Sequence, residues 1–179
     1  MNKIKAASIV VVGSSNTDMV VRTPHLPRPG ETVLGGEFMM NPGGKGANQA
    51  VAVKRLGGDL TFITKVGDDI FGRQTISRLA SLGIPTDFVS ISSDKASGVA
   101  LINVDNKGEN CIAVASGANN ELSPADIDAA ASVIASAGIL LLQLEIPMAT
   151  VAYAAALAKR HGVTVVLNPA PAPSEPLSP

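Results

Sequence analysis

Strand-like and helix-like segments alternate along the chain, and this alternation restricts the fold more than any other feature. The apolar run ILLLQLE (139–145) precedes the helical segment PMATVAYAAALAKRHG (147–162), which precedes a second apolar run, VTVVLN (163–168). Uninterrupted apolar runs are typical of parallel strands that helices bury on both faces. With aromatic residues at only 3%, aliphatic side chains must fill the core. The pattern predicts an α/β fold, a doubly wound parallel sheet with helices on both faces.

The same alternation is present in the first half of the chain. We expect strands at 9–12 and 60–66, and between them a helix that begins after Gly46 and stops at the glycine pair 57–58. This arrangement extends the parallel sheet predicted from the second half.

Capping residues mark two further helices. Asp68 and Asp69 stand where an N-cap belongs, before a helix that ends at Gly83. Ser123 as cap and Pro124 at the first position open another helix. Its predicted buried face consists of Ile127, Ala130, Ala131 and Ile134.

Other strand-like segments do not alternate with helices. They are MVVRT (19–23), ETVL (31–34), GEFMMN (36–41), GVALINVD (98–105) and NCIAVA (110–115), the last two joined by the turn NKG. We expect residues 19–42 and 97–116 to form a small second sheet that stands off the main one. The α/β core then takes the remaining segments, about 7–18, 43–96 and 117–168.

The chain ends in the proline-rich stretch NPAPAPSEPLSP, which predicts an extended connector over residues 169–179. A doubly wound sheet would be expected to continue beyond such a connector. We therefore expect residues 1–179 to be one incomplete domain, a truncated product that lacks the C-terminal half of the fold.

Charge and composition exclude several classes of partner. A net charge of −1 without a basic face argues against nucleic acid, and no run approaches the ~18 apolar residues of a membrane span. The lone Cys111 is expected to be a buried residue of a strand in a reducing, cytoplasmic protein. His25, His161 and Cys111 are too dispersed to predict a zinc or iron site.

Polar residues gather where the predicted strands end. They are Asn16 and Asp18 after the first strand, Glu145 and Asn168 after the last two, and Lys45 and Asn48 at a helix start. The carboxyl ends of parallel strands meet at one edge, so we expect these side chains on one rim. Carboxylates accept hydrogen bonds and amides both accept and donate them, which suits a neutral polyhydroxylated ligand.

Each of these residues also has a structural explanation. Asn16 and Asp18 are common turn and cap formers. A charge at Glu145, directly after an apolar strand, costs several kcal/mol if desolvated and unpaired, which favours a functional role. Lys45 near the positive end of a helix is disfavoured by ~0.3 to 1 kcal/mol, and either a ligand or a partner carboxylate would offset this.

The glycine-rich stretch NPGGKGANQ (41–49) resembles a phosphate-binding loop but lacks the required spacing. A Walker A motif needs glycine and Ser or Thr where Met39 and Gly46 stand, and a dinucleotide fingerprint needs glycine at Gln49. We instead expect a tight turn that brings backbone amides and Lys45 close to a ligand.

Taken together, the motifs resemble those of the ribokinase family of sugar kinases, part of the PfkB-type carbohydrate kinases. The matching segments are GSSNTD (13–18), LPRPGETV (26–33), GGKGANQAVA (43–52), VGDDIFG (66–72), GVALINVD (98–105), GAN (117–119), QLE (143–145) and NPAPA (168–172). They run in family order over nearly the whole chain.

The resemblance implies an α/β domain with a small β lid that closes over the sugar and often pairs with a second subunit's lid, giving a homodimer. It further implies that D-ribose or a similar pentose is bound by Asn16, Asp18, Gly43, Gly44, Lys45, Asn48 and Glu145. The reaction implied is ATP-dependent phosphorylation of the sugar's 5-hydroxyl.

In this family the second half of the sequence binds ATP and Mg²⁺, and in some members a monovalent cation such as K⁺. It also carries the catalytic aspartate of a DTxGAGD-like motif. No such motif occurs in this chain, so the expected base lies beyond Pro179 and no catalytic residue is assigned here. We expect the 179-residue chain alone to be catalytically incompetent.

Two other interpretations stay open. The substrate could be deoxyribose, a phosphosugar or a nucleoside; a phosphosugar would call for a basic cluster, which Arg22, Arg28 and Lys107 do not form. The chain could also be a sugar-binding or interaction module without catalysis.

Overall fold

The computed structural model describes residues 8–173, and in this part of the chain the main sheet has five parallel strands. Their order is β5-β4-β1-β8-β9. The strands are β1 (Ile9–Val12), β4 (Leu60–Gly67), β5 (Val89–Ser92), β8 (Ile139–Leu142) and β9 (Thr164–Leu167). The predicted α/β fold with a parallel sheet is confirmed.

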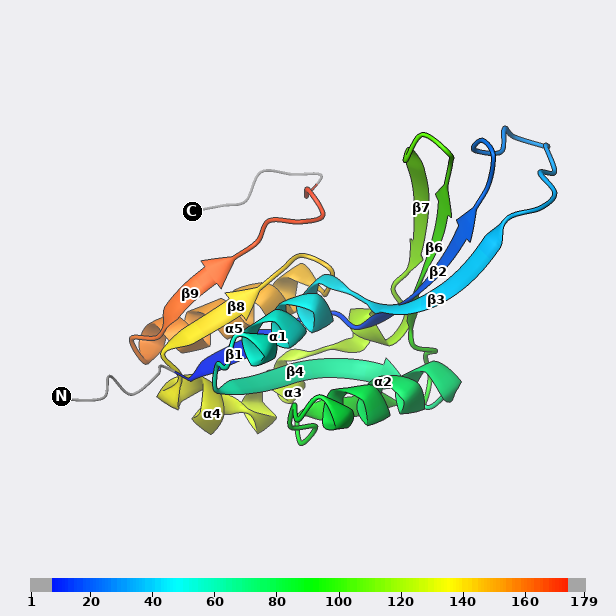
Figure 1. Ribbon diagram of the computed structural model, residues 1–179. Coiled ribbons are helices and arrows are strands. Elements are labelled where there is room, and N and C mark those ends of the chain that lie inside the picture. Colours follow the sequence, from blue (N-terminus) through cyan, green and yellow to red (C-terminus); the bar gives the residue numbers. More distant parts are fainter. Residues whose placement is uncertain (1–7, 174–179) are drawn as a thin grey trace.

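Helices cover both faces of this sheet (Figure 1). On one face lie α1 (Lys45–Arg55) and α2 (Ile70–Ser81); on the other lie α3 (Pro124–Ala129), α4 (Ala131–Ser136) and α5 (Met148–Arg160). Alternate residues of β1 point to opposite faces, so Val11 packs with α1 and α2 while Val10 and Val12 pack with α3 to α5. Burial on both sides is the reason that the strands are apolar without interruption.

A second sheet projects from one end of the first, as Figure 1 shows. This small sheet has the order β3-β2-β6-β7 and consists of β2 (Asn16–Arg22), β3 (Glu37–Gly43), β6 (Gly98–Val104) and β7 (Asn110–Ala115). The predicted hairpin between β6 and β7 is confirmed, since the two strands are antiparallel and the Gly108 amide donates to the Asp105 carbonyl at 3.1 Å. The short 3₁₀ helix η1 (Gly117–Glu121) leads back to the main sheet.

The predicted helix starts agree with the structure. The Asp69 carboxylate caps α2 by accepting from the Gly72 amide at 2.8 Å. Asp69 also accepts from the amide and the hydroxyl of Ser97, both at 2.7 Å, so the same cap fixes the segment before β6. Its neighbour Asp68 is no cap; it pairs with Arg73 on the surface at 3.0 Å.

Three predictions were wrong. ETVL (31–34) is not a strand: residues 31–36 have no regular structure, and positive φ angles at Gly35 and Gly36 direct the chain back into β3. Cys111 lies in a strand but is exposed, because nothing within the described chain covers β7. The helix after Ser123 is interrupted at Ala130, whose φ of −106° and ψ of 10° separate α3 from α4.

After β9 the chain leaves the main sheet. Asn168 donates its amide to the Leu142 carbonyl at 2.9 Å, and residues 169–173 form no helix or strand. The rest of the predicted connector, 174–179, lies outside the described residues. No helix in the described part of the chain combines the length and apolarity needed to cross a bilayer.

Candidate functional site

The small sheet joins the main one where β1 leads into β2 and β3 leads into α1 (Figure 1). Most of the predicted site residues belong to these elements. Asn16 and Asp18 lie in β2, and Gly43 ends β3. Gly44 caps α1 and Lys45 begins it. Asn16 and Asp18 therefore belong to a strand of the small sheet and are not part of a turn after β1.

Glu145 is the centre of this junction. Its Oε1 accepts from the Lys45 ammonium at 2.6 Å, and its Oε2 accepts from the Lys45 backbone amide at 2.8 Å and from the Ser14 hydroxyl at 2.6 Å. The carboxylate thus caps α1 from 100 residues away in the sequence. The ion pair accounts for the lysine at the positive end of a helix.

The other amides at the start of α1 are also taken. The Gly46 amide donates to the Ser14 hydroxyl at 3.3 Å, and the Ala47 amide to the Ser14 carbonyl at 2.8 Å. A phosphate at a helix N-terminus needs free amides, so this end of α1 is not a phosphate site. The amides of Lys45, Gly46 and Ala47 are thus bound to protein groups, and the approach of the glycine turn to a ligand stays a prediction.

The glycines of this stretch allow close backbone packing. A Cβ at Gly46 would lie 2.6 Å from the Gly13 carbonyl carbon, and one at Gly43 would lie 2.1 Å from the Asp18 Oδ1. Gly44 has a φ of 91°, which favours glycine. The glycine turn is therefore required to bring Lys45 and Asp18 to the same place.

The Asp18 carboxylate accepts no hydrogen bond from residues 8–173. The charged groups near it are Glu145 and Lys45. Burial raises the pKa of the Asp18 carboxyl above its usual value; repulsion by Glu145 adds to this, and attraction by Lys45 partly offsets it. Burial by itself raises the pKa of Glu145 as well. There the Lys45 amide and ammonium and the Ser14 hydroxyl outweigh it, and the pKa lies below its usual value.

Asn16 is buried beside Asp18. Its Oδ1 accepts from the side-chain amide of Asn119 at 2.7 Å. The Nδ2 of Asn16 has no acceptor among the described residues, so it is available as a donor. The Asp18 carboxylate and the Asn16 amide lie on the same face of β2. A hydroxyl-bearing ligand could donate to this carboxylate and accept from this amide.

Asn48 and Asn168 are less closely associated with this group. Asn48 is exposed and lines a hollow of about 210 Å³ between α1, α2 and the base of the small sheet, together with Thr17 and Asn41. Asn168 follows β9 and is exposed, and no side-chain hydrogen bond joins it to the residues above in the described structure.

Two residues at the junction were not selected from the sequence. Ser14 holds Glu145 across 131 positions, and Asn119 holds Asn16 across 103 positions. Asn119 falls within the GAN segment of the family resemblance. Neither Ser14 nor Asn119 is a charged residue after a strand of the main sheet, which was the signal that identified Glu145. Only tertiary structure reveals their contacts.

The described residues do not fit a nucleotide phosphate or its metal ion. No group of three or more His, Cys, Asp or Glu side chains in residues 8–173 is placed to hold a metal. Lys45 is committed to Glu145, and the amides of α1 are taken.

Comparison with known proteins agrees with this geometry. Residues 6–178 match the pfkB family of carbohydrate kinases. The chain is 46% identical over 168 residues to the ribokinase of Mus musculus, covering 94% of this chain and 52% of that protein. It is 45% identical over 164 residues to the deoxyribokinase of Salmonella typhi, covering 92% and 54%.

Among solved structures, an Arabidopsis thaliana ribokinase complexed with ribose and ATP has a TM-score of 0.78 to this chain at 33% identity. The match covers 90% of this chain and 53% of that one. The chain thus spans about half the length of the curated relatives it matches. Since the family match extends over almost all of the sequence, the chain belongs to the pfkB family of carbohydrate kinases.

Proposed function

We propose that this chain forms the sugar-binding part of an ATP-dependent kinase that phosphorylates the 5-hydroxyl of D-ribose. The observation that carries the proposal is the uncompensated Asp18 carboxylate, which lies beside the Lys45–Glu145 pair and the free amide donor of Asn16. A neutral sugar can donate hydroxyl protons to Asp18 and accept from Asn16 without bringing a charge into the junction. The ribose and ATP in the related Arabidopsis structure support this choice.

In this proposal the residues of the chain bind and orient the sugar. Asp18 accepts from sugar hydroxyls, Asn16 donates to them, and Asn48 closes the edge of the site from α1. Lys45 and Glu145 hold Gly43 and Gly44 in the turn that shapes the site. Phosphoryl transfer depends chiefly on such positioning and on charge stabilisation.

We assign ATP, Mg²⁺ and any monovalent cation such as K⁺ to residues outside 8–173, together with the catalytic base. The occupied amides of α1 and the lack of a metal-binding group in the described residues support this assignment. The bound nucleotide and metal would supply the phosphoryl group and neutralise its charge. A cytoplasmic location is also proposed, because the exposed thiol of Cys111 suits a reducing compartment.

Calorimetry on the 179-residue chain tests the proposal. We expect binding of ribose, no binding of ATP, and loss of ribose binding in Asp18→Ala and Glu145→Ala. Asp87→Ala is the matched control, because Asp87 is an exposed aspartate remote from the junction. Absence of ribose binding by the wild-type chain would reject the site, and ATP turnover above background would reject the assignment of catalysis elsewhere.

Deoxyribose is a second candidate substrate, favoured by the 45% identity to a deoxyribokinase. The two sugars differ in one hydroxyl, so a site that hydrogen-bonds this hydroxyl should discriminate strongly against deoxyribose. A direct comparison of their dissociation constants therefore distinguishes the two substrates.

A further inference from the structure

Asn119 is a buried polar residue whose side chain forms hydrogen bonds with Ser15 and Asn16. It lies in η1 with only 2% of its surface exposed. Its Oδ1 accepts from the Ser15 amide at 2.9 Å, and its Nδ2 donates to the Ser15 carbonyl at 3.2 Å and to the Asn16 Oδ1 at 2.7 Å. The hydrogen-bonding capacity of the Asn119 donor group is fully used.

These bonds allow one orientation of each amide. The Ser15 backbone N–H can only donate, so it must face the oxygen of Asn119. The Nδ2 of Asn119 then faces Asn16, which must present its own oxygen in return. The Nδ2 of Asn16 is therefore turned away from Asn119.

We propose that Asn119 is a positioning residue that makes Asn16 present its amide donor, and not its oxygen, to the sugar. The inference rests on the proposed sugar site and deepens it. With Asp18 as the acceptor on the same strand, a fixed donor at Asn16 makes the pair complementary to a hydroxyl that both donates and accepts. An Asn16 free to turn would present an oxygen beside the Asp18 carboxylate, two acceptors for one ligand.

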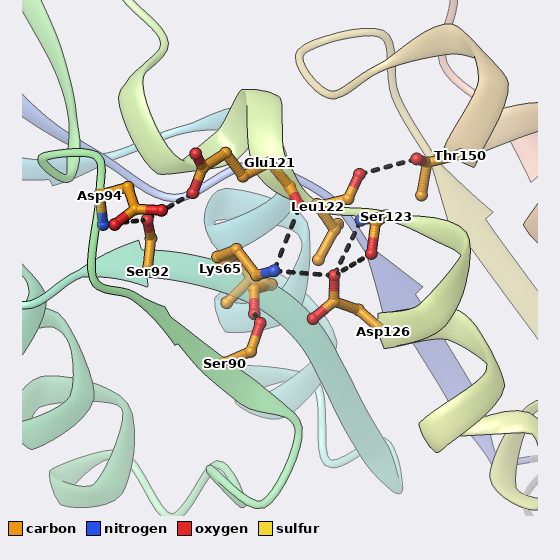
Figure 2. Close-up of polar contacts among 10 residues, drawn as sticks. Lys65, Ser90, Ser92, Asp94, Glu121, Leu122, Ser123, Asp126 and Thr150 are labelled. Carbon is orange, nitrogen blue, oxygen red and sulfur yellow. Dashed lines mark hydrogen bonds and ion pairs between the residues drawn. The ribbon is translucent and has the colours of Figure 1, made fainter.

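The helix that carries Asn119 is held at both ends, and Figure 2 shows the contacts at its Glu121 end. At one end, the Ala118 amide donates to the Ala96 carbonyl at 2.8 Å. At the other end, the Ser92 hydroxyl donates to the Glu121 carboxylate, and the Lys65 ammonium donates to the Glu121 carbonyl at 3.2 Å. Strands β4 and β5 thus fix the position of η1 relative to β2.

Gly98 leaves room for the two amides. A Cβ at this position would lie 2.2 Å from the Asn16 Oδ1 and 2.3 Å from the Asn119 Nδ2. Strand β6 therefore begins with a glycine at the point where the Asn16–Asn119 pair needs the space. The pair is packed as well as hydrogen-bonded, which keeps both amides in one orientation.

The Asn119→Asp variant of the 179-residue chain reverses the orientation. An oxygen then faces Asn16, so Asn16 must turn its Nδ2 inward and its Oδ1 to the site. We expect ribose binding to weaken about tenfold, the effect of one lost hydrogen bond. Asn120→Asp is the matched control, because Asn120 is the next residue of η1 and is exposed.

A double-mutant cycle separates positioning from general damage. If Asn119 acts through Asn16, Asn119→Asp should change ribose affinity by less than about twofold in an Asn16→Ala background. An undiminished effect in that background would overturn the inference. An Asn119→Asp variant that binds ribose as tightly as the wild type would also overturn it.

Side-chain amide exchange measured by NMR needs neither ribose nor a variant. In the wild type, the Asn119 protons should exchange slowly, and those of Asn16 and Asn120 quickly. Fast exchange at Asn119 would overturn the inference even if no variant folds. In Asn119→Asp, the Asn16 protons should become protected, which a purely structural role would not produce. Absence of ribose binding by the wild type rejects the proposed function, and this exchange measurement then still decides the orientation.

Discussion

Asp18 is the residue whose charge is least well compensated at the junction. Its pKa is raised by burial and by Glu145, so folding disfavours its charged form. A carboxyl with a raised pKa stabilises the fold most below its usual pKa of 3.8, and this stabilisation is lost as pH rises through the raised value. The proposed role of Asp18 in binding hydroxyls would account for a carboxyl in such surroundings.

We predict that Asp18→Asn increases the free energy of unfolding at pH 7 while weakening ribose binding. The substitution removes the charge and keeps the shape. The gain in stability should shrink as pH falls to the range where Asp18 is protonated. Urea denaturation across this pH range measures it, with the exposed Asp87→Asn as control. A loss of stability at pH 7 that grows with rising pH would contradict the cause assigned to the shifted pKa.

Glu145 is the opposite case, a carboxylate stabilised by its partners. We predict that Glu145→Gln lowers the free energy of unfolding at pH 7 by about 1–3 kcal/mol. The Lys45 ammonium loses its anionic partner, and the new side-chain NH₂ group faces either this ammonium or the Lys45 backbone amide, which are both donors. The pKa of Glu145 is lowered on folding, so this stabilisation is present above 4.5 and is lost as pH falls. The wild type and the variant should therefore converge in acid.

Denaturation curves of Glu145→Gln and of Glu109→Gln provide the comparison. Glu109 is exposed in the hairpin between β6 and β7, and its side chain has no partner in the described structure. A Glu145→Gln variant as stable as Glu109→Gln at pH 7 would show that the carboxylate does not stabilise the start of α1.

At the scale of elements, burial determined which predictions succeeded. The strands of the main sheet and helices α1, α2 and α5 were predictable because both faces of the sheet and one face of each helix are buried in a regular pattern. The small sheet has no second layer over it in the described chain, so local patterns there were less informative. ETVL has strand-like residues, but the adjoining glycines prevent pairing.

The break between α3 and α4 had no sequence signal, since no glycine or proline stands between Ala125 and Ala137. Similarly, strand ends pointed to Asn16, Asp18 and Glu145, because the carboxyl edge of a parallel sheet gathers its loops, and Lys45 was selected at the start of the next helix. Ser14 and Asn119, which hold Glu145 and Asn16, could not be predicted from the sequence, because their contacts join segments more than 100 residues apart.

The anchoring of η1 and α3 to β4 gives a prediction at this scale. Lys65 donates to Asp126 at 2.9 Å and to the Glu121 carbonyl at 3.2 Å, as Figure 2 shows. Lys65→Met should lower the free energy of unfolding by about 1–3 kcal/mol, because both acceptors lose a donor in a largely buried place. Lys107→Met, in the exposed turn between β6 and β7, is the control.

The effect of Lys65→Met should depend on pH. Burial raises the pKa of Asp126, but Lys65 and Ser123 outweigh it and the pKa lies below 3.8. The stabilisation is therefore present above this value and is lost as pH falls, so the two chains should become more similar in acid. A difference that stays constant with pH would mean that Lys65 acts through packing of its aliphatic stem.

At the scale of the whole molecule, the two faces of the small sheet have different surroundings. Residues paired across a sheet share a face, so Asp18 lies with Asn41 and Ala100 on the face of the candidate sugar site. The opposite face carries Phe38, Met40 and Leu101, which are exposed by 60%, 46% and 54% and adjoin across β3, β2 and β6. The two exposed apolar residues of β7, Ile112 and Val114, lie on the Asp18 face. Adjoining exposed apolar residues on a sheet face are typical of an interface.

We therefore predict that the chain forms a dimer through this opposite face, in which two small sheets cover each other's apolar residues. Leu101→Glu should shift the chain to a monomer in analytical ultracentrifugation, because a charge would have to be buried at the interface. Leu56→Glu is the control: Leu56 is exposed by 88% but lies at the end of α1, away from the small sheet.

The proposed sugar site gives this prediction a second, independent readout. Leu101 points away from Asp18, so Leu101→Glu should leave the direct contacts to ribose in place, and any weakening of ribose binding should follow the loss of the dimer as protein concentration falls. In the wild type, the same dilution through the dimer dissociation range should produce the same change in affinity. A wild-type chain that is monomeric at all concentrations, or a Leu101→Glu variant that remains dimeric, would contradict the interface.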